Sequence, residues 1–276
     1  MITHNGKQVT LAMRNRKAIN LIARNGKAMF MEFSAISWAA RAVILAEYGS
    51  VVWSDVRDYA KAHPQIVEFI NQDPHLACSI SPNSNKERWL VNEDYKAFID
   101  TGYYWRYGSE IKIDIRSISN SGNWAFFGAS NGASYNNGEV AVFWASNGYD
   151  VVTPSSNTVS AVTQCGKGTF LPNARYILEL TKDKFIHNGV EQAVPMFNQY
   201  QGANTMYLFA TNRKPTPWHG AFHLREAIIK HEGETKHHYY PCLYNGIAGM
   251  VDAISGTFHP NANTKGQFTI QITDKE

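Results

Sequence analysis

Paired carboxylates on one predicted strand are the first residues whose spacing could support chemistry. Residues 109–117 alternate isoleucines with charged side chains, so Glu110 and Asp114 fall on the same face of a strand. Glycoside hydrolysis needs two carboxyl groups roughly 5 to 9.5 Å apart. Lys112 lies between these two carboxylates and Arg116 follows them, so we expect a solvated face with a ladder of ion pairs and no catalysis on this strand.

Ten histidines are the second group that could bind a metal or act as bases. His237 and His238 are adjacent, so on a strand they would face opposite sides. His219 and His223 are four residues apart, but a strand is expected here, which removes the helical geometry of a zinc site. We therefore expect these histidines at the surface or in an interface.

Aromatic residues near turns are the third group. An aromatic face stacks on the apolar side of a sugar ring, and neighbouring polar side chains can bind its hydroxyls. The same aromatics could instead fill the ends of a sandwich or a subunit interface, and their spacing leaves both roles open. The candidate ligand-binding residues are Tyr103, Tyr104, Trp105, Tyr107, Tyr135, Tyr149 and Trp218.

The elements that must position these side chains are predicted to be mainly strands. Of the 276 residues, 13% are aromatic and only 18% are charged, and seven Asn-Gly dipeptides signal two-residue hairpin turns. This composition excludes a helical bundle, a coiled coil and a disordered chain. The net charge of +3 implies no nucleic-acid partner, and the longest apolar stretch, 38–46, contains Arg41 and is too short for a membrane span.

A ten-residue repeat distinguishes residues 1–34. An Asn-Gly-Lys or Asn-Arg-Lys turn recurs at positions 5, 15 and 25, each followed by an apolar-rich stretch. We predict a three-stranded β-ribbon in which Leu11 faces Asn20, Val9 faces Ile22, and Ile22 faces Met29. A ribbon of this size is not stable alone, so it either docks on the rest of the chain or joins copies from neighbouring subunits, as an attachment or oligomerisation element.

The remaining chain divides into three further parts. Residues 35–78 change to helical spacing and are predicted to form two or three helices. The polar, turn-rich stretch 79–86 reads as a linker. From 87 to 276 short strands alternate with turns, which predicts an antiparallel β-sandwich. Its clearest strands are 109–117, 124–129, 140–145, 176–180, 184–187, 190–193, 206–210 and 221–230, of which 124–129 and 140–145 are expected to be buried on both sides.

Several spaced motifs resemble the concanavalin A-like lectin/glucanase (laminin-G-like) jelly roll. They are Phe98-Ile99-Asp100-Thr101-Gly102, Glu110-Ile111-Lys112-Ile113-Asp114, Phe126-Phe127-Gly128-Ala129, Phe185-Ile186-His187-Asn188-Gly189 and 206–212. The stretch 240–261, with Gly249-Met250-Val251-Asp252 and Ser255-Gly256-Thr257-Phe258, is similar to the variant in bacteriophage tail and fibre proteins and in surface proteins of gut bacteria. The resemblance covers 87–271, about two-thirds of the chain.

The resemblance also bears on catalysis and on metal ions. Jelly-roll glucanases carry Glu-x-Asp-x-Glu on one strand, and this chain has Lys112 at the centre of the nearest match, so a glycoside hydrolase is disfavoured. Domains of this kind often hold a structural calcium ion, for which Asp100, Asp150 and Asp252 are conceivable ligands that the sequence leaves unassigned. No other cofactor is expected.

The function that the resemblance implies is that of a non-enzymatic bacteriophage virion protein. As a fibre, tail or capsid-decoration component, it would display a lectin-like jelly roll for host-glycan adhesion or surface decoration. The N-terminus lacks the apolar run of a secretory signal, so we expect synthesis in a host cytoplasm and delivery on the virion. Expected partners are other virion proteins through the N-terminal segment, host glycans, and copies of the chain in a homo-oligomer, trimeric as phage fibres commonly are. The alternatives are a glycan-binding module of a bacterial surface protein, a jelly-roll glycoside hydrolase and a purely architectural role.

Overall fold

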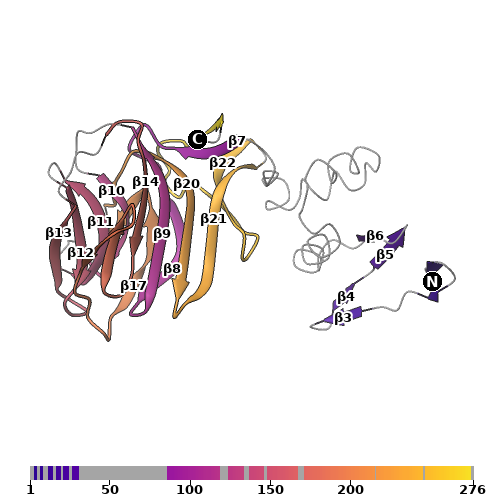
Figure 1. Ribbon diagram of the computed structural model, residues 1–276, viewed down its shortest axis with the longest axis horizontal. Helices are drawn as coiled ribbons and strands as arrows, with labels where there is room; N and C mark the ends of the chain where they lie inside the picture. Colours follow the sequence, from indigo (N-terminus) through magenta and orange to yellow (C-terminus); the bar gives the residue numbers. More distant parts are fainter. Residues whose placement is uncertain are drawn as a thin grey trace. The chain divides into compact units, whose positions relative to one another are not determined.

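The chain forms two compact units, Met1–Asn85 and Lys86–Glu276, which are described separately. The computed structural model describes 86–118, 124–133, 137–145, 148–166, 171–214, 216–244 and 246–274, together with the backbone of short strands among the first thirty residues (Figure 1). The predicted helical segment 35–78 and most of the linker 79–86 lie outside the described residues.

The first unit contains short antiparallel strand pairs. Ile22 pairs with Met29, as the repeat predicted. The described strands form separate two-stranded sheets, whereas a continuous three-stranded ribbon was expected; the predicted partners Val9, Leu11 and Asn20 lie outside the described residues. The pairs are β1 (Thr3–His4) with β2 (Lys7–Gln8), β3 (Ala12–Arg14) with β4 (Lys17–Ile19), and β5 (Leu21–Arg24) with β6 (Lys27–Phe30).

The second unit is a sandwich of two largely antiparallel sheets, which appear as two layers in Figure 1. In the described residues, one sheet has the order β13-β12-β11-β10-β17-β8, with β18 paired to β10 and β19 paired to β18. Its strands are β8 (Ile99–Arg106), β10 (Trp124–Ser130), β11 (Glu139–Ala145), β12 (Gly148–Pro154), β13 (Ser160–Cys165), β17 (Gln201–Leu208), β18 (Ala210–Asn212) and β19 (Trp218–His219).

In the described residues, the other sheet has the order β16-β15-β14-β9-β20-β21-β22-β23, with β7 paired to β20 and β24 paired to β7. Its strands are β7 (Lys86–Val91), β9 (Ser109–Ser117), β14 (Arg175–Leu180), β15 (Lys184–His187), β16 (Val190–Ala193), β20 (Phe222–His231), β21 (Glu234–Tyr244), β22 (Ile247–Asp252), β23 (Phe258–Pro260) and β24 (Thr269–Asp274). No helix in the described ranges is long and apolar enough to cross a membrane.

The main core lies between the two sheets and is rich in aromatic rings. Phe209 stacks on Phe222 with ring centroids 4.3 Å apart, and Phe126 of β10 packs against Phe222 of β20 at 5.4 Å. Ile111, Ile113 and other inward residues of β9 are almost fully buried, as the two-residue alternation predicted. These contacts join the sheets and hold the strands of both in a fixed arrangement.

A second, smaller apolar cluster lies on the outer face of the β8–β13 sheet. It consists of Ala125, Ala141, Phe143 and Val152. Because β10 and β11 contribute to this cluster as well as to the main core, both strands are buried on both sides, which confirms that prediction. The outer face of this sheet is therefore partly covered.

On the outer face of β9, the expectation of a solvated Asp114 was wrong. Asp114 was predicted to be solvated, but only 2% of it is exposed. Arg175 binds its carboxylate through Nε at 2.9 Å and Nη2 at 2.7 Å, and Arg225 approaches from β20 at 2.5 Å. The two arginines are far from β9 in the sequence, so strand alternation alone could not show that they close over Asp114. Lys112 does form the expected ladder pair, with Glu179 at 2.7 Å.

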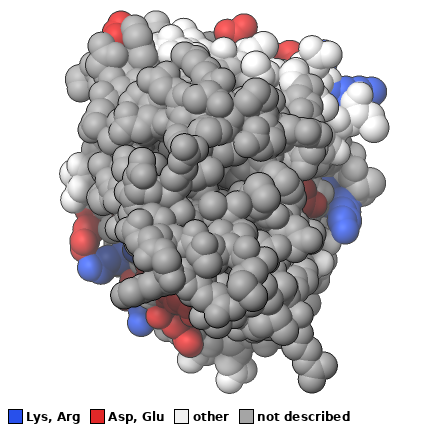
Figure 2. Space-filling view, turned by 90° about the vertical axis from the view of Figure 1, so that its right-hand side faces the viewer, with Lys and Arg blue, Asp and Glu red and all other residues white. Residues whose placement is uncertain are grey.

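Charged side chains of both signs share the described surface. Where Figure 2 shows described residues, acidic and basic groups lie next to one another at several points along the margin. The exposed Lys184–Glu191 pair, 2.6 Å apart, is an example from β15 and β16. Such exposed pairs add little to stability.

Candidate functional site

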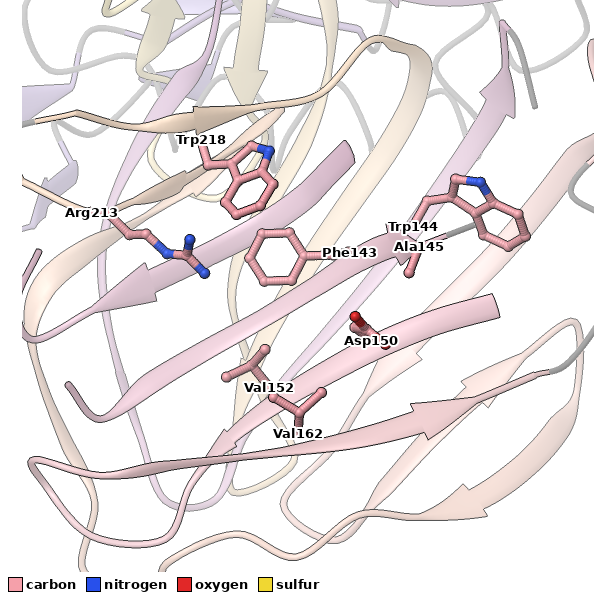
Figure 3. A pocket seen from close by; sticks show the side chains of 8 residues that line it. All are labelled: Phe143, Trp144, Ala145, Asp150, Val152, Val162, Arg213 and Trp218. Carbon is pink, nitrogen blue, oxygen red and sulfur yellow. The ribbon is translucent and has the colours of Figure 1, made fainter. Parts of the chain in front are cut away.

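A hollow of about 330 Å³ opens on the outer face of the β8–β13 sheet. Strands β11, β12 and β13 form its floor, and the connection from β18 to β19 supplies its remaining wall (Figure 3). The residues that line it are Phe143, Trp144, Ala145, Asp150, Val152, Val162, Arg213 and Trp218.

Strand pairing brings the floor residues together. Phe143 lies opposite Asp150 across β11 and β12, and Val152 lies opposite Val162 across β12 and β13. Since successive side chains of a strand point to opposite faces, Phe143 and Asp150 point outward while their neighbours Trp144 and Tyr149 join the main core. The same alternation thus builds the core and the floor of the hollow.

An aromatic–cation stack forms one wall. The rings of Phe143 and Trp218 have centroids 5.5 Å apart. The Cζ atom of Arg213 lies 5.1 Å from the Phe143 centroid and 4.9 Å from that of Trp218, within the range of a cation–π contact. Trp218 is 41% exposed, whereas Phe143 and Arg213 are mostly buried. The stack therefore holds Trp218 in place, while part of its surface stays accessible to a ligand.

Arg213 is held in place by a buried carboxylate. Its Nε and Nη2 donate to the two oxygens of Glu139 at 2.9 and 2.8 Å, and the Thr211 hydroxyl donates to the same carboxylate at 2.8 Å. Burial raises the pKa of the Glu139 carboxyl, although the hydrogen bonds from Arg213 and Thr211 oppose this. The two-pronged geometry fixes the guanidinium plane. Within the described residues, the N–H groups of Nη1 and the second N–H of Nη2 make no hydrogen bond, and Arg213 lines the hollow.

Asp150 is the other charged residue of the lining. It is half-buried, and burial raises the pKa of its carboxyl. In the described part of the chain, its carboxylate makes no hydrogen bond or ion pair, so both oxygens can accept hydrogen bonds from a ligand. The hollow thus combines an aromatic wall, a donor nitrogen and a free acceptor.

The carboxylates of Glu139 and Asp150 belong to this face of the sheet. Asp150 lies opposite Phe143, and Glu139 lies four residues from Phe143 along β11. At the usual rise of a strand, the backbone positions of Glu139 and Phe143 are about 13 Å apart. Glu139 is occupied by Arg213, so within the described residues Asp150 is the carboxylate of the hollow that is open to a ligand.

Comparisons with known proteins give only distant similarities. No family model and no curated protein matches the chain. Among solved structures, it is similar to a candidate carbohydrate-binding protein from Bacteroides ovatus ATCC 8483, with a TM-score of 0.46 and 12% identity over 69% of this chain and 60% of that chain. It is also similar to the Ruminococcus gnavus IT-sialidase CBM40, with a TM-score of 0.40 and 11% identity over 53% of this chain and 91% of that one. A heptameric SAP-like pentraxin from Limulus polyphemus has a TM-score of 0.37 and 10% identity over 72% and 94% of the two chains.

Of the predicted ligand-binding aromatics that the structure describes, only Trp218 lines the hollow. Tyr103, Trp105 and Tyr149 are buried in the main core, at 8%, 0% and 1% exposure. Tyr104 is exposed on the edge strand β8, and Tyr107 is half-buried in the turn after β8. Tyr135 lies outside the described residues.

Sequence reasoning missed Phe143, Arg213 and Glu139. Phe143 sits in a strand that was expected to be buried on both sides, and this could have marked its outer face as covered. Nothing local in the sequence pairs Glu139 with Arg213, because they are 74 residues apart.

The three aspartates considered for calcium lie on different strands. Asp100 accepts a hydrogen bond from the Gly102 amide at 2.9 Å, and Asp252 accepts bonds from residues of its own turn and from His237. Asp150 lies in the hollow. Within the described ranges, no group of three or more His, Cys, Asp or Glu side chains could hold a metal ion.

The histidines are less exposed than expected. The described ones are half-buried, and burial lowers the pKa of His187, His219, His223 and His259. His237 and His238 bind different partners, Asp252 at 3.0 Å and Glu226 at 2.6 Å. They act as packed, hydrogen-bonded residues because neighbouring strands supply carboxylates that the local sequence does not show.

Proposed function

We propose that the second unit is a non-catalytic glycan-binding module and that the hollow is its binding site. The observation that carries the proposal is the partly exposed Trp218 ring, held by Phe143 and Arg213 beside two unengaged polar groups. The face of a tryptophan ring stacks on the apolar side of a sugar ring, and fixed donors and acceptors beside the tryptophan orient the sugar hydroxyls.

The rigidity of the site supports binding. Phe143 lies on a central strand, and Arg213 is fixed by the buried Glu139 carboxylate. Side chains that are already ordered lose little conformational entropy when a ligand binds, so more of the interaction energy appears as affinity. A shallow site with few polar contacts can then still bind an oligosaccharide usefully.

We also propose that the module has no catalytic activity. The engagement of Glu139 by Arg213 supports a binding role over a hydrolytic one, because it leaves Asp150 as the carboxylate of the hollow without an ion-pair partner in the described residues. A glycosidase remains the disfavoured alternative, and release of reducing sugar from a bound oligosaccharide would establish it.

We place the module on a bacteriophage virion, as a fibre, tail or capsid-decoration component. The support is the sequence resemblance of 240–261 to the variant in bacteriophage tail and fibre proteins, a variant that also occurs in surface proteins of gut bacteria. The N-terminal unit would attach it to other virion proteins, and the chain would assemble as a homo-oligomer. Mass spectrometry of purified virions tests this, and detection in the envelope of uninfected cells would instead support the bacterial surface alternative.

The binding site is tested by Trp218→Ala. We expect a glycan array to identify ligands of the wild-type chain, and Trp218→Ala to weaken their binding by at least about tenfold because the stacking surface is lost. Tyr104→Ala is the matched control, since Tyr104 is also an exposed aromatic of the same sheet but does not line the hollow.

Thermal melting of both variants checks that the sandwich is intact. Equal binding by Trp218→Ala and the wild type would contradict the assignment of the site. Failure of the wild type to bind any host glycan would contradict the glycan-binding function and leave the architectural role.

A further inference from the structure

The charges around the hollow do not balance. Arg213 and Glu139 neutralise each other through two hydrogen bonds, at 2.9 and 2.8 Å. Asp150 has no cationic partner within the described residues. The charged groups of the site therefore leave one uncompensated negative charge, on the side of the hollow formed by β12.

Arg213 and Asp150 lie apart in the hollow and would contact different parts of a ligand. Figure 3 shows Arg213 and Asp150 on either side of the Phe143 ring, with Trp218 above it. A ligand stacked on this wall would meet the guanidinium of Arg213 at one end and the Asp150 carboxylate at the other. A sugar hydroxyl can satisfy either group, since it both donates and accepts hydrogen bonds.

Arg213 offers little net charge to an anionic ligand. Carboxylate recognition by arginine is strong when two parallel N–H groups of a charged guanidinium bind two oxygens. Here the Nε–Nη2 edge already binds Glu139, and that carboxylate cancels the positive charge. The N–H groups of Nη1 and the second N–H of Nη2 remain as donors, beside an ion pair without net charge.

We infer that this site selects neutral hexose units and discriminates against sugars that carry a carboxylate, and that Asp150 imposes the discrimination. The inference rests on the proposed glycan-binding function of the same hollow. A ligand carboxylate bound here would be repelled by Asp150 at close range, in surroundings less polar than water, where like charges weaken binding by about tenfold or more. A neutral sugar instead donates its hydroxyls to the same carboxylate.

The experiment compares paired ligands on the full chain. Titration calorimetry measures the affinity of the protein for oligosaccharides with a terminal glucose, galactose or N-acetylhexosamine. It also measures the affinity for the same oligosaccharides when they end in glucuronic or sialic acid. We expect the acidic member of a pair to bind at least about tenfold more weakly. Higher salt should narrow this difference, since the hollow is open to solvent and screening acts on exposed charges.

Asp150→Asn tests the residue assignment. The substitution keeps the shape and one acceptor oxygen but removes the charge, so the ratio of neutral to acidic affinity should fall to about threefold or less. Glu191→Gln is the matched control, because it removes one negative charge from an exposed residue of the other sheet and should leave the ratio unchanged.

The outcomes distinguish a failure of the charge discrimination from a failure of the glycan-binding function. Equal affinity of the wild type for acidic and neutral members, or an unchanged ratio in a folded Asp150→Asn, overturns the inference and leaves glycan binding in place. No binding of either class overturns the proposed function itself. Loss of binding by Trp218→Ala, together with a lower ratio of neutral to acidic affinity in Asp150→Asn, supports both the proposed function and the inference.

Discussion

Glu139 is a buried carboxylate that supports the proposed binding site from behind Arg213. None of its surface is exposed, and it accepts hydrogen bonds from Arg213 and Thr211. A buried charge is costly unless it is paired, and the pair here is nearly ideal in geometry. We interpret Glu139 as a positioning residue that holds the guanidinium against Phe143 and Trp218.

This interpretation predicts that Glu139→Gln both destabilises the protein and weakens glycan binding. Removing one partner leaves the mostly buried Arg213 charge uncompensated, which we expect to lower the free energy of unfolding by about 3 kcal/mol. Denaturant titration measures this loss, and calorimetry with a neutral oligosaccharide measures the accompanying loss of affinity.

Glu191→Gln provides the comparison for stability. It breaks an ion pair of similar length, 2.6 Å to Lys184, that is exposed to solvent, and we expect no measurable change. If Glu139→Gln were as stable as the wild type and bound glycans normally, the positioning role would be wrong.

The residues of the hollow were only partly predictable from sequence. Trp218 stood out because it follows prolines in a turn-rich segment. Phe143 and Arg213 did not, because they meet only when β11 and the segment after β18 come together across the sheet. Patterns of one strand report which face a side chain occupies, but they do not report what covers that face.

At the scale of elements, Asp252 organises the turn between β22 and β23. Its carboxylate accepts hydrogen bonds from the amides of His238, Ile254 and Ser255 at 2.9, 3.0 and 3.2 Å. The Ser255 hydroxyl and His237 donate to it as well. Burial alone would raise the pKa of this carboxyl, but these hydrogen bonds outweigh burial and lower the pKa well below its usual value.

The lowered pKa predicts a pH-dependent cost of Asp252→Asn. Because the folded-state pKa lies below the unfolded value of about 3.9, the ionised carboxylate stabilises the fold above that pH, and the contribution is lost as pH falls toward the folded pKa. We expect the variant to lose about 2 kcal/mol of unfolding free energy at neutral pH, from its charge-assisted hydrogen bonds. The difference from the wild type should shrink below about pH 4.

Denaturant titrations at neutral and acidic pH measure both quantities. Asp183→Asn, in the exposed turn between β14 and β15, is the control that should change little at either pH. A stability difference that is constant across this pH range would argue against an ionised Asp252 as the source.

The strands themselves were predictable where their alternation is local. The predicted range 109–117 coincides with β9, and 184–187 and 190–193 coincide with β15 and β16. The turn between β15 and β16 carries Asn188 and Gly189 at φ values of 47° and 83°, as an Asn-Gly hairpin turn requires. Burial of Asp114 was not predictable, since it depends on arginines contributed by β14 and β20.

At the scale of the whole molecule, we propose separate roles for the two units. The second has an extensive core of its own between two sheets. The first has strand pairs of two to four residues, too short to be stable without further contacts. The proposed roles are display for the second unit and assembly for the first.

The assembly role predicts that the first unit controls the oligomeric state. Mass photometry should give a multiple of the 31.0 kDa chain for the full-length protein and a lower multiple for a chain that begins at residue 35. Burial of apolar side chains between copies of 1–34 is the expected driving force. Identical, monomeric masses for both proteins would rule out this segment as an oligomerisation element.

The alternation of β11 and β12 gives the module a capacity for diversification. Val140, Val142 and Val151 point into the core and hold the sheets together, while Phe143, Asp150 and Val152 point outward to the hollow. Outward positions can therefore be exchanged, by evolution or in a designed library, while the inward set preserves the fold. One scaffold of this kind could be retargeted from one surface sugar to another by changes at a few alternate positions.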